Sequence, residues 1–440
     1  MKTDLIIIGS GPGGYETAAY AARQGLQVTI IEEKLAGGTC LNCGCIPTKS
    51  LVHDAEKAMG KANGQALFQA AIERKDNVVT NLRQGVEAMM HQPGINIVHG
   101  HATFKNSHCV AVDEEDFEAE HIIIATGSTP KLPPIPGLGG DGQPVSPFVV
   151  TSEELLTRKE LPHDLCIIGA GVIGLEMASV FSAFGCKVTV VEFLKECLPT
   201  MDSEIARRLR RLMEKQGVKF YMGSAVQSID NNKVIFKDTK KGTMADVEAD
   251  VILVATGRKP CTKNLNIEAI GLEAGPKGIV TNENMQTNLP HIYAVGDVNG
   301  RQMLAHAATF QGYRAINHIL GNADNIRLDI MPAAVFTHPE AASVGPTEDV
   351  CKANNMTYTT RKAIYRANGR AQAIAQTEGL VKLIFDENNR VIACHALGVD
   401  AAYLTQEISA LMNFNITRLQ LSNIIHIHPT LSEILLDASR

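Results

Sequence analysis

The sequence lacks long hydrophobic runs and an excess of positive charge, and each absence excludes a class of protein. No apolar stretch in the 440 residues reaches the roughly 18 that a membrane-spanning helix needs, so we expect no membrane partner. The net charge of −6 provides no basic surface of the kind that binds nucleic acid, so we expect no nucleic-acid partner. The first apolar run is too short for a signal peptide and leads straight into a glycine motif.

The cysteines are few for a chain of this length, ten in all, and no export signal accompanies them. This usage indicates the reducing cytoplasm, where a structural disulfide framework is not expected and a disulfide is more often catalytic. With 45% hydrophobic and 20% charged residues, the composition is that of a globular protein with room for two or three domains.

A dinucleotide-binding pattern opens the chain. Residues 4–8 form an apolar, β-branched run typical of a buried parallel strand, and three glycines follow in G-x-G-x-x-G spacing: Gly9, Gly11 and Gly14. An alanine-rich helix is expected to about residue 24, and a second strand over 27–31 ends at Glu32. Glycines at these positions let the backbone approach a pyrophosphate at the helix N-terminus, and Glu32 would accept hydrogen bonds from ribose hydroxyls.

The same pattern occurs a second time. A strand over 165–168 precedes a glycine triplet at Gly169, Gly171 and Gly174, and a strand over 187–191 ends at Glu192. Both copies close with similar strands, IIIATG at 122–127 and VILVATG at 251–257. Two dinucleotide-binding domains imply two dinucleotides. Glu192 favours NAD for the second, because a carboxylate accepts a hydrogen bond from the ribose 2′-hydroxyl and repels a 2′-phosphate.

The first copy is longer than the second, and its extra length holds the segment GGTCLNCGCIPTK at 37–49, with Cys40, Cys43 and Cys45. A metal site would need about four suitably spaced ligands, so we expect no metal. Two disulfide pairings stay open. Cys40–Cys43 is a C-x-x-C pair, whereas Cys40–Cys45 spans about 7.5 Å in a regular helix, beyond the roughly 7 Å limit for a bridge. The longer pair therefore requires a distorted helical turn.

The last third of the chain has no glycine motif. A segment rich in proline and glycine at 130–147 predicts a linker, and a strand at 288–296 returns the chain to a sheet. Beyond about residue 328, strands are predicted at 336–345, 380–385 and 390–397, with helices at about 401–414 and 431–437. We expect these elements to form a third domain of mixed α/β type.

A second group of reactive side chains lies in HIHPTLSE, residues 426–433. Pro429 favours an extended conformation at His428. Thr430 and Glu433 fit a capping box, so a helix-capping role for Glu433 stays open. A histidine can take a proton from a thiol near neutral pH. His426 is expected to be structural.

The cysteine segment resembles the GGTC-x-N-x-GC-x-P-[ST]-K signature of the flavin-dependent pyridine nucleotide–disulfide oxidoreductases. Both glycine motifs, both ATG strands and the Gly-Asp pair at 296–297 also occur in the family's order. The resemblance implies an α/β fold with two Rossmann-like domains, for FAD and NAD, and a C-terminal α+β dimerisation domain. The corresponding boundaries are 1–150 completed by about 271–328 for FAD, 151–270 for NAD, and 329–440 for dimerisation.

The resemblance also implies roles for individual residues. Cys40 and Cys45 would form the redox disulfide, with Cys40 exchanging with substrate and Cys45 lying against the flavin. Cys43 stands where an aliphatic residue is usual, and we expect it to be a bystander. Lys49, paired with Glu176, would lie near the flavin N5.

In the same family, the histidine before proline is the acid–base residue, which carries over to His428 with Glu433 orienting it. This histidine would serve the disulfide of the other subunit of a homodimer. FAD contacts are expected from the first glycine motif, Glu32, Glu33, Gly38, Thr39, Lys49, Ala102, Thr126, Gly127, Asp297 (on the ribityl chain) and Ala305. NAD contacts are expected from the second glycine motif, Glu192, Val226 and Gly257.

Three shorter segments resemble the dihydrolipoyl dehydrogenase branch of this family: LAH at 304–306, FTHPE with SVG at 336–345, and ANGRA at 367–371. The resemblance implies NAD-dependent oxidation of dihydrolipoamide or of the lipoyl domains of 2-oxo acid dehydrogenase or glycine cleavage complexes. The alternative is a mercuric-reductase-like or stress-linked NAD(P)H-dependent reductase of disulfides or metal ions. A thiol redox sensor with Cys43 as resolving thiol and an NADH oxidase are two further hypotheses.

Overall fold

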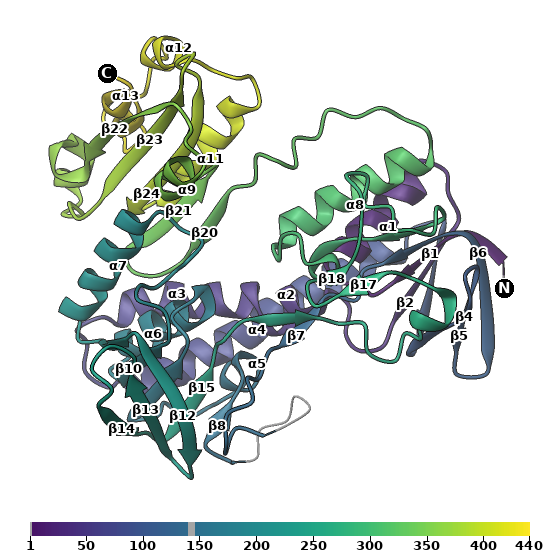
Figure 1. Ribbon diagram of the computed structural model, residues 1–440, viewed down its shortest axis with the longest axis horizontal. Helices are drawn as coiled ribbons and strands as arrows, with labels where there is room; N and C mark the ends of the chain where they lie inside the picture. Colours follow the sequence, from purple (N-terminus) through teal and green to yellow (C-terminus); the bar gives the residue numbers. More distant parts are fainter. Residues whose placement is uncertain (1, 140–145) are drawn as a thin grey trace. The chain divides into compact units, whose positions relative to one another are not determined.

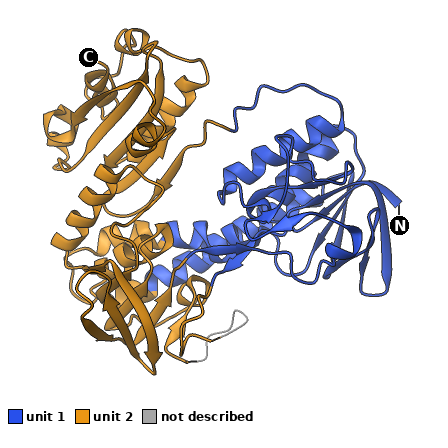
Figure 2. Ribbon diagram, in the orientation of Figure 1, with its two compact units in different colours: residues 1–50, 70–131, 257–328 blue, residues 51–69, 132–256, 329–440 orange. Residues whose placement is uncertain are grey.

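The computed structural model describes residues 2–139 and 146–440, so residues 140–145 of the predicted linker at 130–147 lie outside the described residues. The chain divides into two compact units (Figure 2). Unit 1 consists of Met1–Ser50, Ala70–Lys131 and Gly257–Leu328, and unit 2 of Leu51–Gln69, Leu132–Thr256 and Asp329–Arg440. In the part of the chain that the structure describes, no helix is long and apolar enough to cross a membrane.

Unit 1 is built on a sheet with the order β3-β2-β1-β6-β5-β4, and β19 pairs with β6 (Figure 1). Strands β3, β2, β1, β6 and β19 run parallel, whereas β6, β5 and β4 form an antiparallel meander. The bounds are β1 Lys2–Ile8, β2 Val28–Glu32, β3 Ile95–His99, β4 Ala102–Asn106, β5 Cys109–Val112, β6 Glu115–Ile124 and β19 Ile292–Ala294.

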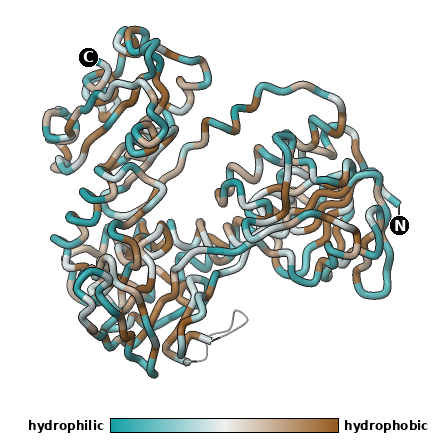
Figure 3. Tube along the Cα trace, in the orientation of Figure 1, coloured by the Kyte–Doolittle hydropathy of each residue, from teal (hydrophilic) through white to brown (hydrophobic). Residues whose placement is uncertain are grey.

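The apolar run of β1 confirms the predicted buried strand. Leu5, Ile6 and Ile7 are fully buried, as a strand covered on both faces requires, and Figure 3 shows the strands of this sheet as a hydrophobic centre. Helix α1 (Pro12–Arg23) follows the first glycine motif, and its alanines let it pack closely on α8 (Ala305–Ile319).

Three helices account for the extra length of the first copy. They are α2 (Gly38–Cys43), α3 (Cys45–Ala58) and α4 (Gly64–Met90), all between β2 and β3. The second copy has instead the helix α7 (Ser203–Lys215) between the corresponding strands. The cysteine segment therefore lies in an insertion of the first copy, as predicted.

Unit 2 contains a second parallel sheet, with the order β11-β10-β9-β15-β8. The bounds are β8 Val149–Val150, β9 Asp164–Ile168, β10 Lys187–Glu192, β11 Lys219–Met222 and β15 Val251–Val254, with helix α6 Val172–Ala183 after β9. Its order β11-β10-β9-β15 repeats the order β3-β2-β1-β6 of unit 1. A separate antiparallel sheet of β12 (Ser224–Asp230), β13 (Lys233–Asp238) and β14 (Met244–Glu248) follows.

The remaining sheet of unit 2 is antiparallel, with the order β20-β21-β24-β23-β22. Its bounds are β20 Ala333–Val335, β21 Glu340–Val344, β22 Tyr358–Ile364, β23 Leu380–Asp386 and β24 Val391–Gly398. The helices of this region are α9 Glu348–Ala353, α10 Gly369–Ala373, α11 Ala401–Met412, α12 Arg418–Ser422 and α13 Glu433–Ser439. Two Rossmann-like sheets and this α+β portion confirm the predicted fold class, whereas the exact domain boundaries stay a prediction.

The strand predicted at 336–345 begins only at Glu340. The preceding backbone amides bind helix α6 instead, because Phe336 N donates to Glu176 Oε1 at 2.9 Å and His338 N donates to Ser179 Oγ at 3.0 Å. Pro339 has no amide hydrogen to donate to a ladder.

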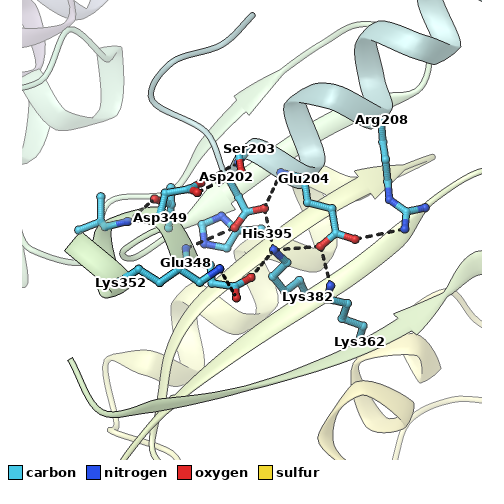
Figure 4. A network of polar contacts seen from close by, with 12 residues as sticks. Asp202, Ser203, Glu204, Arg208, Glu348, Asp349, Lys352, Lys362, Lys382 and His395 are labelled. Atoms are coloured by element: carbon cyan, nitrogen blue, oxygen red, sulfur yellow. Dashed lines mark hydrogen bonds and ion pairs between the residues drawn. The ribbon is translucent and has the colours of Figure 1, made fainter. Parts of the chain in front are cut away.

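A buried lysine on β23 joins helix α7 to the five-stranded antiparallel sheet β20-β21-β24-β23-β22 within unit 2 (Figure 4). Lys382 on β23 is 1% exposed, and its Nζ lies 2.7 Å from Asp202 and 3.0 Å from both Glu204 and Glu348. Burial lowers the pKa of Lys382, but the three carboxylates more than offset this and raise it above its usual value. The lysine is therefore held as a cation at this junction.

Candidate functional site

The first glycine motif has no room for a side chain at two of its three glycines, Gly9 and Gly14. Gly9 has φ +100°, and a Cβ there would lie 2.5 Å from the Ala125 carbonyl oxygen. A Cβ on Gly14 would overlap the Gly9 carbonyl. Gly11, the N-cap of α1, has no side chain to cap the helix, and Pro12 and Gly14 leave the approach to the helix N-terminus uncovered for an anion.

The second motif repeats this geometry. Gly169 has φ +110°, and a Cβ there would lie 2.5 Å from the Ala255 carbonyl oxygen. A Cβ on Gly174 would overlap the Gly169 carbonyl, and a Cβ on Gly171 would meet nothing within 4 Å. Both motifs therefore present the same close-approach surface at a helix N-terminus.

The acids that end the second strand of each copy are also held alike. Glu32 accepts from the amides of Ser10 at 2.7 Å and Lys34 at 2.8 Å. Glu192 accepts from the amides of Ala170 and Leu194, both at 2.6 Å. Because each carboxylate oxygen has two lone pairs, both acids can still accept hydrogen bonds from a ribose. The residues present thus fit one dinucleotide at each motif.

The redox segment contains the helix distortion that the longer disulfide pairing requires. Helix α2 ends at Cys43, Gly44 has φ −140° and ψ −109°, and α3 begins at Cys45. A Cβ on Gly44 would lie 2.9 Å from the Thr39 carbonyl oxygen. The Gly44 carbonyl accepts from the amide of Thr48 at 3.1 Å and from its hydroxyl at 2.6 Å.

This break brings Cys40 and Cys45 together. Their thiols share a hydrogen bond, which raises the pKa of Cys40, and partial burial raises it further. The Lys49 ammonium, one helical turn after Cys45, acts in the opposite direction and lowers it. The site thus combines two adjacent sulfurs with one nearby cation, whereas Cys43 lies half-buried at the end of α2.

Asn42 is a site residue to which the sequence analysis assigned no role. Its amide nitrogen donates to the carbonyls of Ala36 and Gly38, both at 2.9 Å, and its oxygen accepts from Arg83 of α4 at 3.2 Å. It therefore fixes the start of the redox helix. The asparagine in the GGTC-x-N signature was the signal that pointed to it.

The other predicted FAD residues in unit 1 are distributed over several elements. Ser128 Oγ donates to Asp297, which lies in a 3₁₀ turn after β19, and Arg258 donates to Ser128 Oγ at 2.8 Å. Glu33 lies 2.6 Å from His101 Nδ1. The remaining positions are Gly38 and Thr39 at the start of α2, Ala102 at the start of β4, Thr126 and Gly127 after β6, and Ala305 at the start of α8.

The predicted partner of Lys49 lies in unit 2. Glu176 on α6 is 3% exposed and accepts from the amide of Phe336, so the expected buried acid is present. Lys49 belongs to unit 1, and its pairing with Glu176 stays a prediction. Of the NAD positions, Val226 lies in β12 and Gly257 follows β15.

Glu433 serves two purposes at the C-terminus. Its Oε1 lies 2.9 Å from His428 Nδ1, and its Oε2 accepts from the amide of Thr430 at 2.9 Å. The Thr430 amide and then His428 lower the pKa of the Glu433 carboxyl. Because Nδ1 is engaged, Nε2 of the 79% exposed His428 is the nitrogen left for proton transfer. His426 is buried against Glu407, 3.1 Å away, as a structural residue would be.

Large apolar side chains are exposed on the same part of unit 2. Five residues have exposed fractions between 70% and 97%: Tyr403, Phe414, Leu419, Ile425 and Ile427. Soluble monomers seldom expose so many large apolar groups near one another in sequence, so these residues indicate a contact surface.

Comparisons with known proteins agree with this arrangement. The family model of the pyridine nucleotide-disulphide oxidoreductases matches residues 3–312, and the dimerisation domain of the same family matches residues 331–439. The chain is 37% identical to the mitochondrial dihydrolipoyl dehydrogenase 1 of Arabidopsis thaliana, over 100% of this chain and 90% of that protein. It is 35% identical to dihydrolipoyl dehydrogenase 3 of Pseudomonas putida, over 100% of this chain and 98% of that protein.

Among solved structures, one similar protein is the HOCl-induced flavoprotein disulfide reductase RclA from Escherichia coli, as a Cu(II) complex. The TM-score is 0.89 at 31% sequence identity, and the match covers 100% of this chain and 99% of that one.

Proposed function

The chain belongs to the pyridine nucleotide-disulphide oxidoreductase family, and on that premise we propose that it oxidises dihydrolipoyl groups to lipoyl disulfides. It is an NAD-dependent disulfide oxidoreductase whose cofactors are FAD and NAD. The prediction of two dinucleotide cofactors is thereby confirmed. The substrate and the roles of individual residues remain our proposal.

The observation that carries the proposal is the hydrogen bond between Cys40 and Cys45 across the Gly44 break. It favours the C-x4-C pairing, because the two thiols are already adjacent. Lys49 supports a thiolate on the pair, since a nearby cation favours the charged form of a thiol.

The proposed reaction begins at His428, which accepts the proton of a dihydrolipoyl thiol through Nε2. The substrate thiolate attacks Cys40 Sγ, which breaks the Cys40–Cys45 bond and releases the Cys45 thiolate. The second substrate thiolate attacks the sulfur bound to Cys40, closes the lipoyl disulfide and leaves Cys40 reduced. The two protons of the substrate go to His428 and to solvent. Bound FAD would supply the chemistry that carries the electron pair onward to NAD.

We propose that the protein acts as a homodimer in which His428 serves the disulfide of the second subunit. The exposed apolar residues between Tyr403 and Ile427 support this, because they lie next to His428 in the sequence and would be buried in a dimer. The lipoyl domains of 2-oxo acid dehydrogenase or glycine cleavage complexes are the proposed partners, and the cytoplasm is the proposed location.

A stress-linked NAD(P)H-dependent reductase of disulfides or metal ions is the second candidate. The observation that favours it is the similarity over almost the whole length of both chains to a reductase described as HOCl-induced and bound to Cu(II). The extra thiol of Cys43, which the family signature does not require, is compatible with such a role.

Reduction of NAD by dihydrolipoamide, followed by absorbance, tests the proposal. We expect the wild type and Cys43→Val to turn over at similar rates, and Cys45→Ser to lose dithiol turnover. An inactive Cys43→Val beside an active Cys45→Ser would show that the pairing is Cys40–Cys43. No NAD reduction by dihydrolipoamide, with NADH-driven reduction of Cu(II) or of a different disulfide, would favour the second candidate.

A further inference from the structure

A cavity in unit 2 has no part in the proposed reaction. It measures about 190 Å³ and lies where α3, α6 and the residues after α7 meet. Its walls come from Val52, Ala55, Glu56, Met59 and Gly60, from Ser179, Val180, Ser182 and Ala183, and from Gln216 and His338.

The cavity lies at the C-terminal ends of three helices. Helix α3 ends at Ala58, α6 ends at Ala183, and Gln216 is the C-cap of α7. The last turn of each helix carries a partial negative charge of about half an electron, from carbonyls without intrahelical partners. Three such ends around one cavity make its interior electronegative. None of the described residues that line it is a lysine or an arginine.

One carboxylate, that of Glu56, adds to this negative potential. Glu56 lines the cavity, and Nδ1 of His338, also in its wall, lies 3.7 Å from Glu56 Oε1. That distance is too long for a good hydrogen bond. Glu340, two residues after His338, is partly buried, and burial together with the charges of Asp400 and Glu56 raises its pKa. Glu340 is not part of the cavity wall and its raised pKa favours its neutral form, so Glu56 is the acid that acts on the cavity.

The rest of the wall is suited to a short carbon chain. Val52, Ala55, Val180 and Ala183 are apolar, and Met59 supplies a polarisable thioether. A cavity of about 150 Å³ accommodates a molecule of the size of benzene, so this one has room for a ligand of five to eight heavy atoms.

We propose that this cavity is a binding site for a small organic ammonium ion, with its charge beside Glu56 and its carbon chain against the apolar wall. An ammonium group is attracted both by the partial negative charge of three helix C-termini and by the Glu56 carboxylate. An anion would be repelled by the same groups, and a neutral molecule would gain only the apolar contacts.

The site is distinct from the dinucleotide and redox sites within the same helices. Helix α3 carries Cys45 and Lys49 on its first turns, and α6 begins at the second glycine motif, whereas the cavity contacts the last turns of both. A ligand there would touch both functional helices without contacting the reacting sulfurs.

The test is direct binding of n-butylammonium to the FAD-loaded protein, by ligand-observed NMR and thermal unfolding at constant ionic strength. Butan-1-ol and butyrate are the neutral and anionic controls of similar size. We expect saturable binding of n-butylammonium, a higher melting temperature in its presence, and no comparable effect of either control.

Three variants locate the site. Glu56→Gln is expected to weaken n-butylammonium about tenfold, because a hydrogen bond to a charged group is lost. Ala183→Leu, which fills the cavity, is expected to remove binding. Glu268→Gln removes the same charge from an exposed residue of unit 1 and is expected to leave binding unchanged. Equal binding of butan-1-ol, no saturable binding of n-butylammonium, or undiminished binding to Glu56→Gln would each overturn the proposal.

Discussion

One carboxylate, that of Glu433, contacts His428 through Oε1 and accepts from the backbone amide of Thr430 through Oε2. The same side chain therefore joins His428 to the backbone that leads into α13.

Replacing Glu433 separates these two contributions. Glu433→Gln keeps a hydrogen-bond acceptor and is expected to lower kcat about tenfold with a small change in melting temperature, since the imidazolium loses its counter-charge. Glu433→Ala also leaves the Thr430 amide without its charged acceptor and is expected to lose about 1–3 kcal/mol of stability. Steady-state kinetics and urea unfolding measure the two effects. An unchanged kcat in both variants would remove Glu433 from the mechanism.

The break at Gly44 is expected to be sensitive to a single methyl group. Gly44→Ala would place a Cβ 2.9 Å from the Thr39 carbonyl oxygen and 3.3 Å from the Cys40 Cα, so the backbone that holds the two thiols must shift. Dithiol turnover is expected to fall at least about tenfold, because small misplacements of reacting groups are costly. The flavin spectrum should be retained.

Gly85→Ala is the matched control. Gly85 lies within α4, and a Cβ there would meet nothing within 4 Å. Alanine at this helical position is expected to leave activity unchanged and to raise stability by about 0.5–1 kcal/mol. If Gly44→Ala behaved like Gly85→Ala, the break would not be what sets the geometry of the thiols.

We expect the stability of unit 2 to depend strongly on the buried Lys382. Lys382→Met leaves Asp202, Glu204 and Glu348 without their shared cation and is expected to cost about 3–5 kcal/mol in urea unfolding. Lys362→Met removes a more exposed partner of Glu204 and is expected to cost about 0–1 kcal/mol. Similar losses in the two variants would contradict this assignment.

We expect the folded protein to lose stability in mild acid because of buried histidines in unit 1. The rings of His108 and His291 are stacked with centroids 3.8 Å apart, and burial lowers the pKa of both His291 and His121. The unfolded chain then binds more protons than the folded one below the ordinary histidine pKa of about 6.5, so stability falls as the pH decreases through that value. His121→Phe should reduce the dependence of the melting temperature on pH between about 7 and 5. The exposed His91, replaced by Gln, serves as the control.

Sequence patterns predicted best the helices, strands and turns whose conformation is determined by residues close together in the chain. The β-branched run of β1 and the two glycine triplets specify strand, turn and helix locally, and the structure has them at those positions. The exposed edge strand Tyr358–Ile364 was not predicted, because an edge strand with polar side chains shows little apolar alternation.

Sequence patterns did not predict contacts between residues that are far apart in the chain. Nothing near Lys382 in the sequence indicates that its partners are Asp202 and Glu348, and nothing near Glu56 indicates that α6 and α7 end beside it. Glu433 was the intermediate case. The sequence suggested a capping box and an orienting role as alternatives. The structure has the contact with His428 and a bond from the Thr430 amide, but α13 begins at Glu433 with Ser432 as its N-cap, so the capping box is not formed.

The contact of Gly9 with Ala125 and that of Gly169 with Ala255 show that the two nucleotide-binding halves are built alike. Both halves forbid a side chain at the same two places and hold the same acid by the same two amides. That agreement is what a tandem duplication of one nucleotide-binding unit would leave. In the described residues, the helices that carry the redox cysteines occur in the first copy alone.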